Sequence, residues 1–349
     1  MKYKQFDRRL LTQEPLSTRK NKVVIDRSYI RADSPDPKMS PENKATVQRL
    51  ARYILDARDK GAYVMLAFGA HSIKNGLGPL MVEFIKRGWI NHLATNGAGI
   101  IHDWEFAYQG ESSESVAKNL PEGRFGIWNE TGLYLNLAIA AGAYEGLGYG
   151  AGVGKAIEEH GILIPSEEEL LSRIEEGESP ETISAAADLL RVVRNAGLKA
   201  GWLEIPSPFA KYSLQAGAYR YGVASTDHPM FGHDIIYTHS ANCGSAIGRA
   251  AERDFLSFVD STSRLTGGVY LSLGSAVMSP LVFEKAFTMA QNVAIQKGTP
   301  IHGHHIAIVD LGEIKRDWSR SNPDSLDFLM MDNRDFLLSL YHELCSMTK

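Results

Sequence analysis

The stretch from Gly69 to Asp103 constrains the fold of this chain more than any other part of the sequence. An apolar run over 63–68 ends in a glycine-containing turn, and a helical segment then leads to a second apolar run over 90–94 and the turn 96–99. This order predicts a strand–helix–strand unit with a loop after each strand. In open parallel sheets ligands bind at the carboxyl ends of strands, where helix N-termini favour phosphate. The stretch therefore predicts a nucleotide-type site.

The composition is that of an ordinary globular protein, with 349 residues, 44% hydrophobic and 22% charged. A net charge of −4 gives no electrostatic reason to expect nucleic acid or an anionic membrane as partner. Two cysteines, Cys243 and Cys345, do not make a disulfide framework. The polar first residues lack the apolar core of a signal peptide, and no apolar run approaches the roughly 20 residues that span a bilayer. We expect a cytoplasmic protein.

The chain divides at about residue 40. Residues 1–40 are polar and contain several prolines, and we expect them to form an extended N-terminal arm. A helix begins at Ser40-Pro41-Glu42, with serine as the N-cap and proline at the first helical position. Residues 41–349 are predicted to form a single large α/β domain with a helical insertion around 130–200.

The second half of the chain alternates between strand and helix patterns. We expect strands over 234–237, 269–273 and 306–309, helices over 246–259 and 280–291, and a helical end over 326–345. This alternation predicts an α/β fold with a Rossmann-like, doubly wound and mostly parallel sheet. The glycine-dense stretch 146–155 lacks the glycine spacing of a phosphate-binding P-loop. We expect it to form a flexible or closely packed bend.

Small residues at three strand ends, 69–71, 96–99 and 274–276, would let a ligand approach main-chain N–H groups. None of these loops has the GxGxxG spacing of a conventional dinucleotide site. Histidines beside carboxylates, His102-Asp103 and His233-Asp234 among them, are candidates for acid–base chemistry or for a cationic ligand.

Metal and covalent chemistry have weaker candidates. The histidines His302, His304 and His305 lack a known zinc spacing, so we predict no metal site. A metal-dependent hydrolase that uses these histidines is kept as a weaker alternative function. No GxSxG motif is present, and a desolvated lysine is the remaining kind of nucleophile. The candidate lysines are Lys74, Lys285 and Lys315.

Three segments, 69–103, 226–240 and 266–286, resemble in order the conserved segments of deoxyhypusine synthase and its bacterial relatives. They correspond to a glycine loop and TAGG-type turn, to a TDGSLGD segment with two inserted residues, and to a strand that ends in a triple-glycine turn. The stretch 123–130 resembles a fourth segment more weakly. The resemblance covers roughly residues 60–315.

The resemblance implies an NAD-binding, Rossmann-like fold in a homotetramer. Members of the family oxidise spermidine with NAD, hold the aminobutyl group as an imine on a lysine, and transfer it to an acceptor amine. The implied cofactor-binding residues are Gly69, His71, Asn75, Gly76, Asn96, Gly97, Ala98, Asp103, Asp227, Gly274, Ser275 and Ala276. The resemblance implies Asp234 as the carboxylate that binds the amine. We expect His239 or His102 to serve as general base near neutral pH, and we keep Lys315, near the family's lysine segment but outside its motif, as a catalytic candidate.

The chain also departs from the family. His102 stands at an acidic position, Pro280 and Glu284 replace a histidine and an asparagine, and the Trp-Gly-Lys segment has no clear counterpart. We therefore predict an NAD-dependent enzyme of deoxyhypusine synthase-like type that acts on a polyamine or a similar cationic amine, with aminobutyl transfer as an optional further step. The alternative is a non-catalytic, NAD-binding oligomer without the imine-forming lysine.

Overall fold

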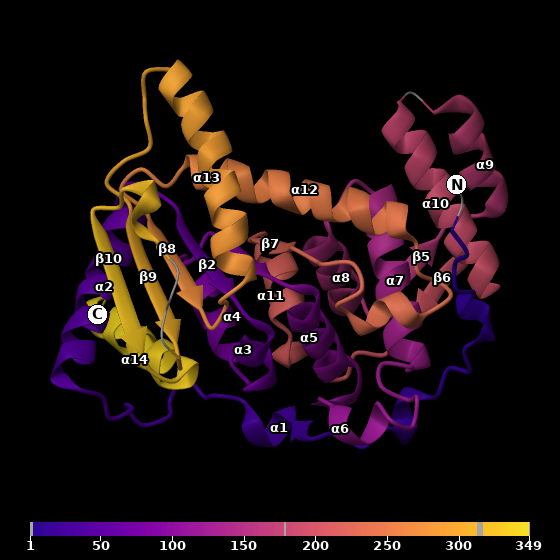
Figure 1. Ribbon diagram of the computed structural model, residues 1–349, viewed down its shortest axis with the longest axis horizontal. Helices are drawn as coiled ribbons and strands as arrows, with labels where there is room; N and C mark the ends of the chain where they lie inside the picture. Colours follow the sequence, from indigo (N-terminus) through magenta and orange to yellow (C-terminus); the bar gives the residue numbers. More distant parts are fainter. Residues whose placement is uncertain (1–2, 178, 313–316, 349) are drawn as a thin grey trace.

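Six parallel strands form the central sheet of the computed structural model, which describes residues 3–177, 179–312 and 317–348 (Figure 1). Neighbouring strands follow the order β10-β9-β8-β2-β3-β7. The strands are β2 (Val64–Phe68), β3 (His92–Thr95), β7 (Ala224–Asp227), β8 (Val269–Leu273), β9 (His305–Asp310) and β10 (Ser325–Met330). The predicted α/β class with a doubly wound parallel sheet is confirmed.

The strand order places a topological switch point between β2 and β8. The chain runs from β2 to β3 and β7 on one side, and then returns to β8, β9 and β10 on the other side. Renumbered along the chain, this is the order 3-2-1-4-5-6 of dinucleotide-binding sheets. Because the connections diverge at the switch point, the loops after β2 and β8 are where a ligand is expected.

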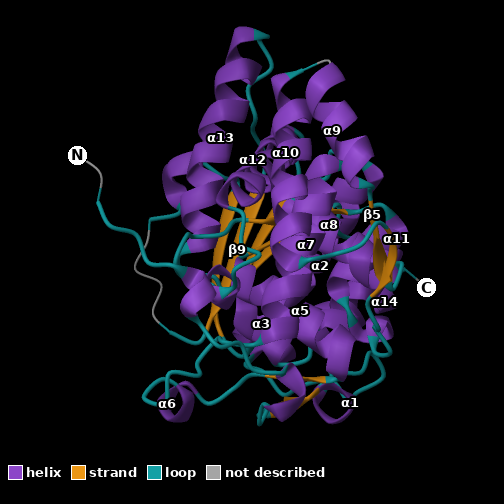
Figure 2. Ribbon diagram, turned by 90° about the vertical axis from the view of Figure 1, so that its right-hand side faces the viewer, coloured by secondary structure: helices purple, strands orange, loops and turns teal. Residues whose placement is uncertain are grey.

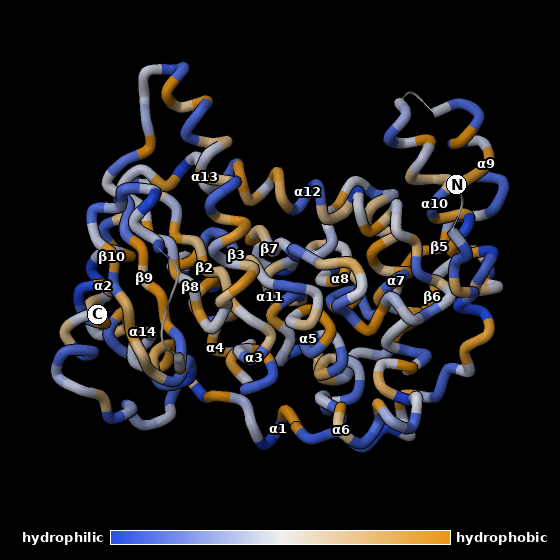
Figure 3. Tube along the Cα trace, in the orientation of Figure 1, coloured by the Kyte–Doolittle hydropathy of each residue, from blue (hydrophilic) through white to orange (hydrophobic). Residues whose placement is uncertain are grey.

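Alternate residues of each strand face opposite layers of helices, as a pleated sheet requires. Leu66 and Leu271 pack in one core with α2, α4 and α14, whereas Met65 and Tyr270 pack in another core with α12 and α13. Figure 2 shows helices on both sides of the strands, and Figure 3 shows the hydrophobic strands between them. A third core joins α5, α7, α8, α10 and α12 beside β7.

The helices of the described residues include those predicted to begin at residue 41 and to span 246–259 and 280–291. They are α2 (Pro41–Asp59), α3 (Ala70–Lys74), α4 (Gly78–Lys86), α5 (Gly97–Gln109), α6 (Val116–Asn119), α7 (Asn129–Tyr144), α8 (Tyr149–Glu158), α9 (Glu167–Glu176), α10 (Pro180–Ala196), α11 (Leu214–Tyr221), α12 (Gly244–Ser263), α13 (Met278–Gln296) and α14 (Asn333–Met347). The two-stranded sheet β5 (Gly161–Ile164) with β6 (Gly201–Glu204) flanks the predicted helical insertion. In the described part of the chain, no helix is both long and apolar enough to cross a membrane.

The N-terminal arm lies along the carboxyl edge of the sheet (Figure 1). It contains the short elements η1 (Arg8–Leu10), η2 (Leu16–Thr18), β1 (Val23–Val24) and α1 (Ile25–Ser28). β1 pairs antiparallel with β4 (Glu111–Ser112). Between these short elements the described part of the arm has no regular secondary structure, and its division from the rest of the chain at residue 40 stays a prediction.

Three local predictions are wrong. The expected strand 234–237 is the 3₁₀ helix η4 (Ile235–Thr238), because the strand of this segment, β7, ends at Asp227. The expected helical end 326–345 begins with the strand β10. Its residues Leu326 and Leu329 lie on opposite faces of the strand and pack in the two cores of the sheet. The glycine-dense stretch 146–155 is mostly helix α8 rather than a bend.

Glycines permit α8 to pack unusually close to its neighbours. A Cβ on Gly150 would overlap the carbonyl of Ser225 in β7, and a Cβ on Gly154 would press on the carbonyl of Gln215 in α11. Glycine normally weakens a helix interior, and here close backbone contact offsets that weakness. The glycines therefore bring α8 against the end of β7.

Replacing one of these glycines tests the contact. We expect Gly150→Ala to lower the free energy of unfolding by about 1–3 kcal/mol through overpacking against Ser225. The matched control is Gly248→Ala in exposed α12, where no atom lies within reach of a Cβ, and it should raise stability by up to about 1 kcal/mol. Urea denaturation measures both, and a stabilising Gly150→Ala would contradict the packing.

Candidate functional site

The loops after β2 and β8 touch at the switch point. The Gly69 N–H donates to the carbonyl of Leu273 at 3.0 Å, and a Cβ on Gly69 would overlap the Gly274 carbonyl. Gly274 has a φ of +57° and would clash with Asn333 if it carried a side chain. Only glycine fits both positions, so the backbone itself forms the floor of the switch point.

A cavity of about 230 Å³ opens beside this floor, and we call it the switch-point cavity. Its lining residues come from α3 and from the loops after β8, β9 and β10: His71, Asn75, Gly274, Asp310, Leu311, Asp332 and Asn333. The Oδ1 atom of Asn333 is buried and has no hydrogen-bond partner among the described residues. Unpaired acceptor oxygens suit the hydroxyl groups of a ribose or the N–H of a carboxamide. The volume suits one nucleoside half of a dinucleotide.

A second cavity of about 280 Å³ lies under the N-terminal arm, and we call it the arm cavity. Its walls are the arm, α3, α5, the segment around α6 and the loop before η4. The lining residues are Arg19, Lys22, Lys74, Ala98, Ile101, His102, Glu105, Ser113, Glu114, Val116, Phe125, His233, Asp234 and Ile235. Helix α3 contributes to both cavities, since His71 and Asn75 line one and Lys74 lines the other.

A buried ion pair attaches the arm to α5. The Arg19 guanidinium donates to both carboxylate oxygens of Glu105, at 2.7 and 2.5 Å, and each side chain is 1% exposed. Ser112 and Thr131 also donate to this carboxylate, at 2.6 and 3.0 Å. Burial is the largest single effect and raises the pKa of Glu105, but the charge and hydrogen bonds of Arg19, with smaller effects of His102 and Ser112, together hold the pKa below its ordinary value. Glu105 is therefore a fully paired buried anion.

The Glu105 carboxylate also fixes the orientation of His102. Ser112 Oγ gives its proton to Glu105, so it must accept from Nδ1 of His102, 2.7 Å away. The hydrogen-bond network thereby assigns the proton to Nδ1 and leaves Nε2 as a free acceptor. Burial lowers the pKa of His102 against the opposing pull of Glu105, so the ring is neutral at pH 7. His102 has the protonation state of a general base.

Asp234 brings a carboxylate against the start of α5. A Cβ on Gly97 would lie 2.6 Å from Cγ of Asp234, so only glycine leaves room for that side chain. The Oδ2 atom of Asp234 is buried and has no partner among the residues described. Burial raises the pKa of Asp234 to about 6, against a smaller opposing effect of His233. An ammonium group in the arm cavity would supply the missing partner.

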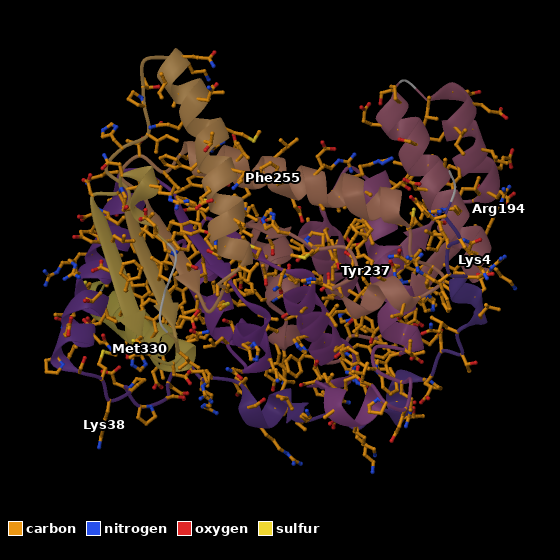
Figure 4. The ribbon with its side chains drawn as sticks, viewed as in Figure 1. Lys4, Lys38, Arg194, Tyr237, Phe255 and Met330 are labelled. Atoms are coloured by element: carbon orange, nitrogen blue, oxygen red, sulfur yellow. The ribbon has the colours of Figure 1, made fainter. Side chains whose placement is uncertain are left out.

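More buried oxygens without partners lie behind Asp234. Asp227 is fully buried at the end of β7, and neither carboxylate oxygen has a hydrogen-bond partner within the described ranges. The hydroxyls of Tyr149 and Tyr237 are also unpaired there, and Figure 4 labels Tyr237. Burial, with Asp234 and Asp254 as like charges, raises the pKa of Asp227 well above its ordinary value. Asp227 therefore holds a proton more tightly than an ordinary aspartate does.

The structure places other predicted residues in structural positions. Asp103 accepts hydrogen bonds from Ser213 Oγ and from the N–H groups of Leu214 and Gln215, at 2.5–3.0 Å, and so caps α11. Asn96 caps α5 by accepting from the Gly99 N–H. A Cβ on Gly76 would overlap Ser28 of the arm, so this glycine permits arm docking.

The remaining predicted residues are spread over the fold. His239 packs against Gly132 of α7 and accepts from the Ala241 N–H, away from the residues that line the two cavities. Ser275 accepts from the Ser279 N–H at the start of α13, and Ala276 is exposed beside it. Lys315 lies outside the described residues.

The histidines over 302–305 do not converge. His304 contacts Ser321 through Nε2, and His305 stacks on Tyr53 with ring centroids 3.6 Å apart. Among the residues with a described placement, no group of three or more His, Cys, Asp or Glu side chains could hold a metal ion.

Sequence reasoning missed the residues that the arm contributes. Arg19 and Lys22 precede the predicted domain by about 20 positions, and no local pattern connects them with α5. Ser112 was also missed, because its role depends on the turn after α5 bringing it back to His102. Lys74 was a candidate only as a nucleophile, although its position on the predicted strand–helix loop was already a signal.

Comparisons with known proteins find solved structures that resemble this chain at low similarity. No family model matches it, and no curated protein matches it. A conserved protein provisionally described as LOR/SDH, from Methanococcus maripaludis S2, is similar at 13% identity and a TM-score of 0.46, over 93% of this chain and 74% of that one.

Two further solved structures are similar to this chain. AgrE, solved with ornithine and NAD⁺, has 16% identity and a TM-score of 0.44 over 89% of this chain, which spans about a third (34%) of AgrE. A protein provisionally described as deoxyhypusine synthase, from Entamoeba histolytica, has 10% identity and a TM-score of 0.43 over 89% of this chain and 91% of that one. At these TM-scores the function must be argued from this chain's own geometry.

The raised pKa of Asp234 predicts a pH effect on stability. The carboxyl binds its proton more tightly in the folded chain, with a pKa of about 6 against an ordinary 3.8. Its stabilising contribution is complete below pH 3.8 and is lost as the pH rises through about 6, which amounts to about 3 kcal/mol at most.

We expect Asp234→Asn to reduce the loss of stability between about pH 4 and pH 7 by up to that amount, about 3 kcal/mol. The control is Asp59→Asn on the exposed end of α2, which should leave the pH dependence unchanged. Urea denaturation at several pH values measures the effect, and identical slopes in all three proteins would refute it.

Proposed function

We propose that this protein is an NAD-dependent enzyme that oxidises a small amine. The observation that carries the proposal is the pair of cavities that share α3, one of them at the switch point of a 3-2-1-4-5-6 sheet. The switch-point cavity has acceptor oxygens for a nucleoside. The arm cavity contains both the unpaired carboxylate of Asp234 and the neutral ring of His102. The neighbours solved with NAD⁺ or described as deoxyhypusine synthase agree with this assignment but do not decide it.

The residues at the switch point fit a dinucleotide. Asn333 Oδ1 and the carboxylate of Asp310 would accept from ribose or carboxamide donors in the switch-point cavity. His71 and Asn75 would contact the same half from α3. The contact of Gly69 with Gly274 would let the cofactor approach the main chain. When bound, NAD⁺ supplies a hydride acceptor.

The residues of the arm cavity would prepare the amine for hydride loss. The Asp234 carboxylate would hold the substrate ammonium, and Nε2 of His102 would take the proton that the nitrogen releases. Oxidation of the bound ammonium form to an iminium ion releases one proton from nitrogen, which His102 takes, and one hydride from carbon, which NAD⁺ would accept. Glu105 then stabilises the protonated His102 through Ser112. His239 and Lys315 have no step in this proposal.

Polyamine specificity, aminobutyl transfer, the tetramer and the cytoplasmic location remain predictions. Incubation of the purified chain with NAD⁺ and a panel of polyamines and other small amines tests the proposed function. We expect NADH to appear with at least one amine and the product to be an imine or its hydrolysed carbonyl. NAD⁺ binding by calorimetry without NADH formation would instead support the non-catalytic alternative, and no NAD⁺ binding would overturn both.

Substitution at Ser112 tests how His102 is positioned. Without the hydroxyl, Nδ1 loses the acceptor that fixes the tautomer, so we expect Ser112→Ala to lower kcat about tenfold with a smaller change in KM. His102→Ala should lower kcat by about 100-fold or more. The matched control is Ser115→Ala at the start of α6, where the side chain makes no capping hydrogen bond.

The pH profile separates positioning from a merely structural role. Because the pKa of His102 is lowered, kcat/KM should rise with pH through a value below the ordinary histidine pKa of about 6.5. Ser112→Ala should displace this acid limb, whereas Ser115→Ala should not. An unchanged limb in Ser112→Ala, at any level of activity, would remove Ser112 from the proposal.

A further inference from the structure

The arm cavity has lining charges of both signs, which an all-cationic substrate does not explain. Three basic side chains, Arg19, Lys22 and Lys74, and three carboxylates, Glu105, Glu114 and Asp234, line it. A site built for a ligand with several positive charges would be expected to present mainly carboxylates. The informative charges are those whose hydrogen-bonding capacity no protein group already fills.

Three of the six lining charges are already satisfied within the protein. Arg19 and Glu105 pair with each other through two hydrogen bonds, and Asn21 accepts from the remaining Arg19 Nε at 2.7 Å. Glu114 accepts from the Asn119 side chain at 2.6 Å and also from the Gly126 N–H and the Trp128 indole, at 3.1 and 2.8 Å. These groups shape the cavity but have little capacity left for a ligand.

Lys22, Lys74 and Asp234 are the charges that remain. Neither lysine forms an ion pair with Asp234 or with any other carboxylate in the part of the chain that the structure describes. Lys74 is half-buried on α3, and Lys22 lies on the arm just before β1. Asp234 Oδ2 is buried and unpaired. The cavity thus offers two separate ammonium groups and one separate carboxylate.

We infer that the arm cavity binds a zwitterionic amine, a substrate that carries a carboxylate as well as the ammonium group. The substrate ammonium contacts Asp234, and its carboxylate contacts Lys74 and Lys22. This inference rests on the proposed function. It narrows the substrate from amines in general to amino acids, in which the α-amino group or a basic side chain supplies the ammonium. A linear polyamine would place a second cation against two lysines, where like charges repel.

Two ligands that differ only in the carboxylate test this inference. L-lysine and 1,5-diaminopentane have the same carbon chain and amines, and only L-lysine has the carboxylate. We expect calorimetry on the full chain, with and without NAD⁺, to show at least tenfold tighter binding of L-lysine. L-alanine and L-glutamate extend the panel to amino acids without a side-chain amine.

Lysine variants connect the preference to its residues. We expect Lys74→Met to reduce the ratio of the two affinities about tenfold, and Lys22→Met with Lys74→Met to abolish it, because methionine keeps the apolar stem and removes the charge. The matched control is Lys118→Met on exposed α6, which does not line the cavity and should leave the ratio unchanged. Circular dichroism of each variant checks that it is folded.

The outcomes separate the inference from the proposed function. Carboxylate-dependent binding that is lost in the double variant, without NADH formation, keeps the inference and overturns the proposed function. NADH formation with diamines but not with amino acids keeps the proposed function and overturns the inference. Equal affinity for L-lysine and 1,5-diaminopentane, or a ratio that Lys22→Met with Lys74→Met leaves unchanged, also overturns it.

Discussion

The buried ion pair between Arg19 and Glu105 is the interaction on which the arm cavity depends. Taking two charges out of water is unfavourable, and their pairing offsets this only when every remaining lone pair and proton is satisfied. Ser112 and Thr131 complete the Glu105 carboxylate. One residue of α5 therefore organises the arm, the turn after α5 and the start of α7. Loss of either charge would leave the other buried without a partner.

The pair also links the position of the arm to the chemistry of His102. The same Glu105 oxygen that receives Arg19 Nη2 receives Ser112, and Ser112 in turn orients His102. If the arm moved away, Glu105 would lose its main stabilising charge, its pKa would rise, and the acceptor behind Ser112 would weaken. Docking of the arm and protonation of the base are thus coupled through one carboxylate.

The sequence predicted the sheet and its strand ends because these depend on local patterns. Apolar runs over 63–68 and 269–273 are β2 and β8 almost to the residue, and the glycines after them meet at the switch point. The pattern failed at 234–237, where a short apolar run is a 3₁₀ turn. It failed again at β10, an edge strand whose apolar Phe328 and Met330 are exposed, so that its pattern did not stand apart from the helix that follows.

The residues of the candidate site were harder to predict than the fold, since their roles depend on contacts between distant segments. Asp103 and His102 are neighbours in sequence, yet the helix turns them to different faces, so that one caps α11 and the other lines the arm cavity. Asp234 was predicted from its carboxylate, but its use depends on Gly97, 137 positions earlier, leaving room for it. Lys22 acquires a role only because β1 pairs with β4 and brings the arm across the cavity. A positive charge that arrives from the arm changes the type of ligand that the carboxylate of Asp234 can accept, and this change is visible only when the chain is folded.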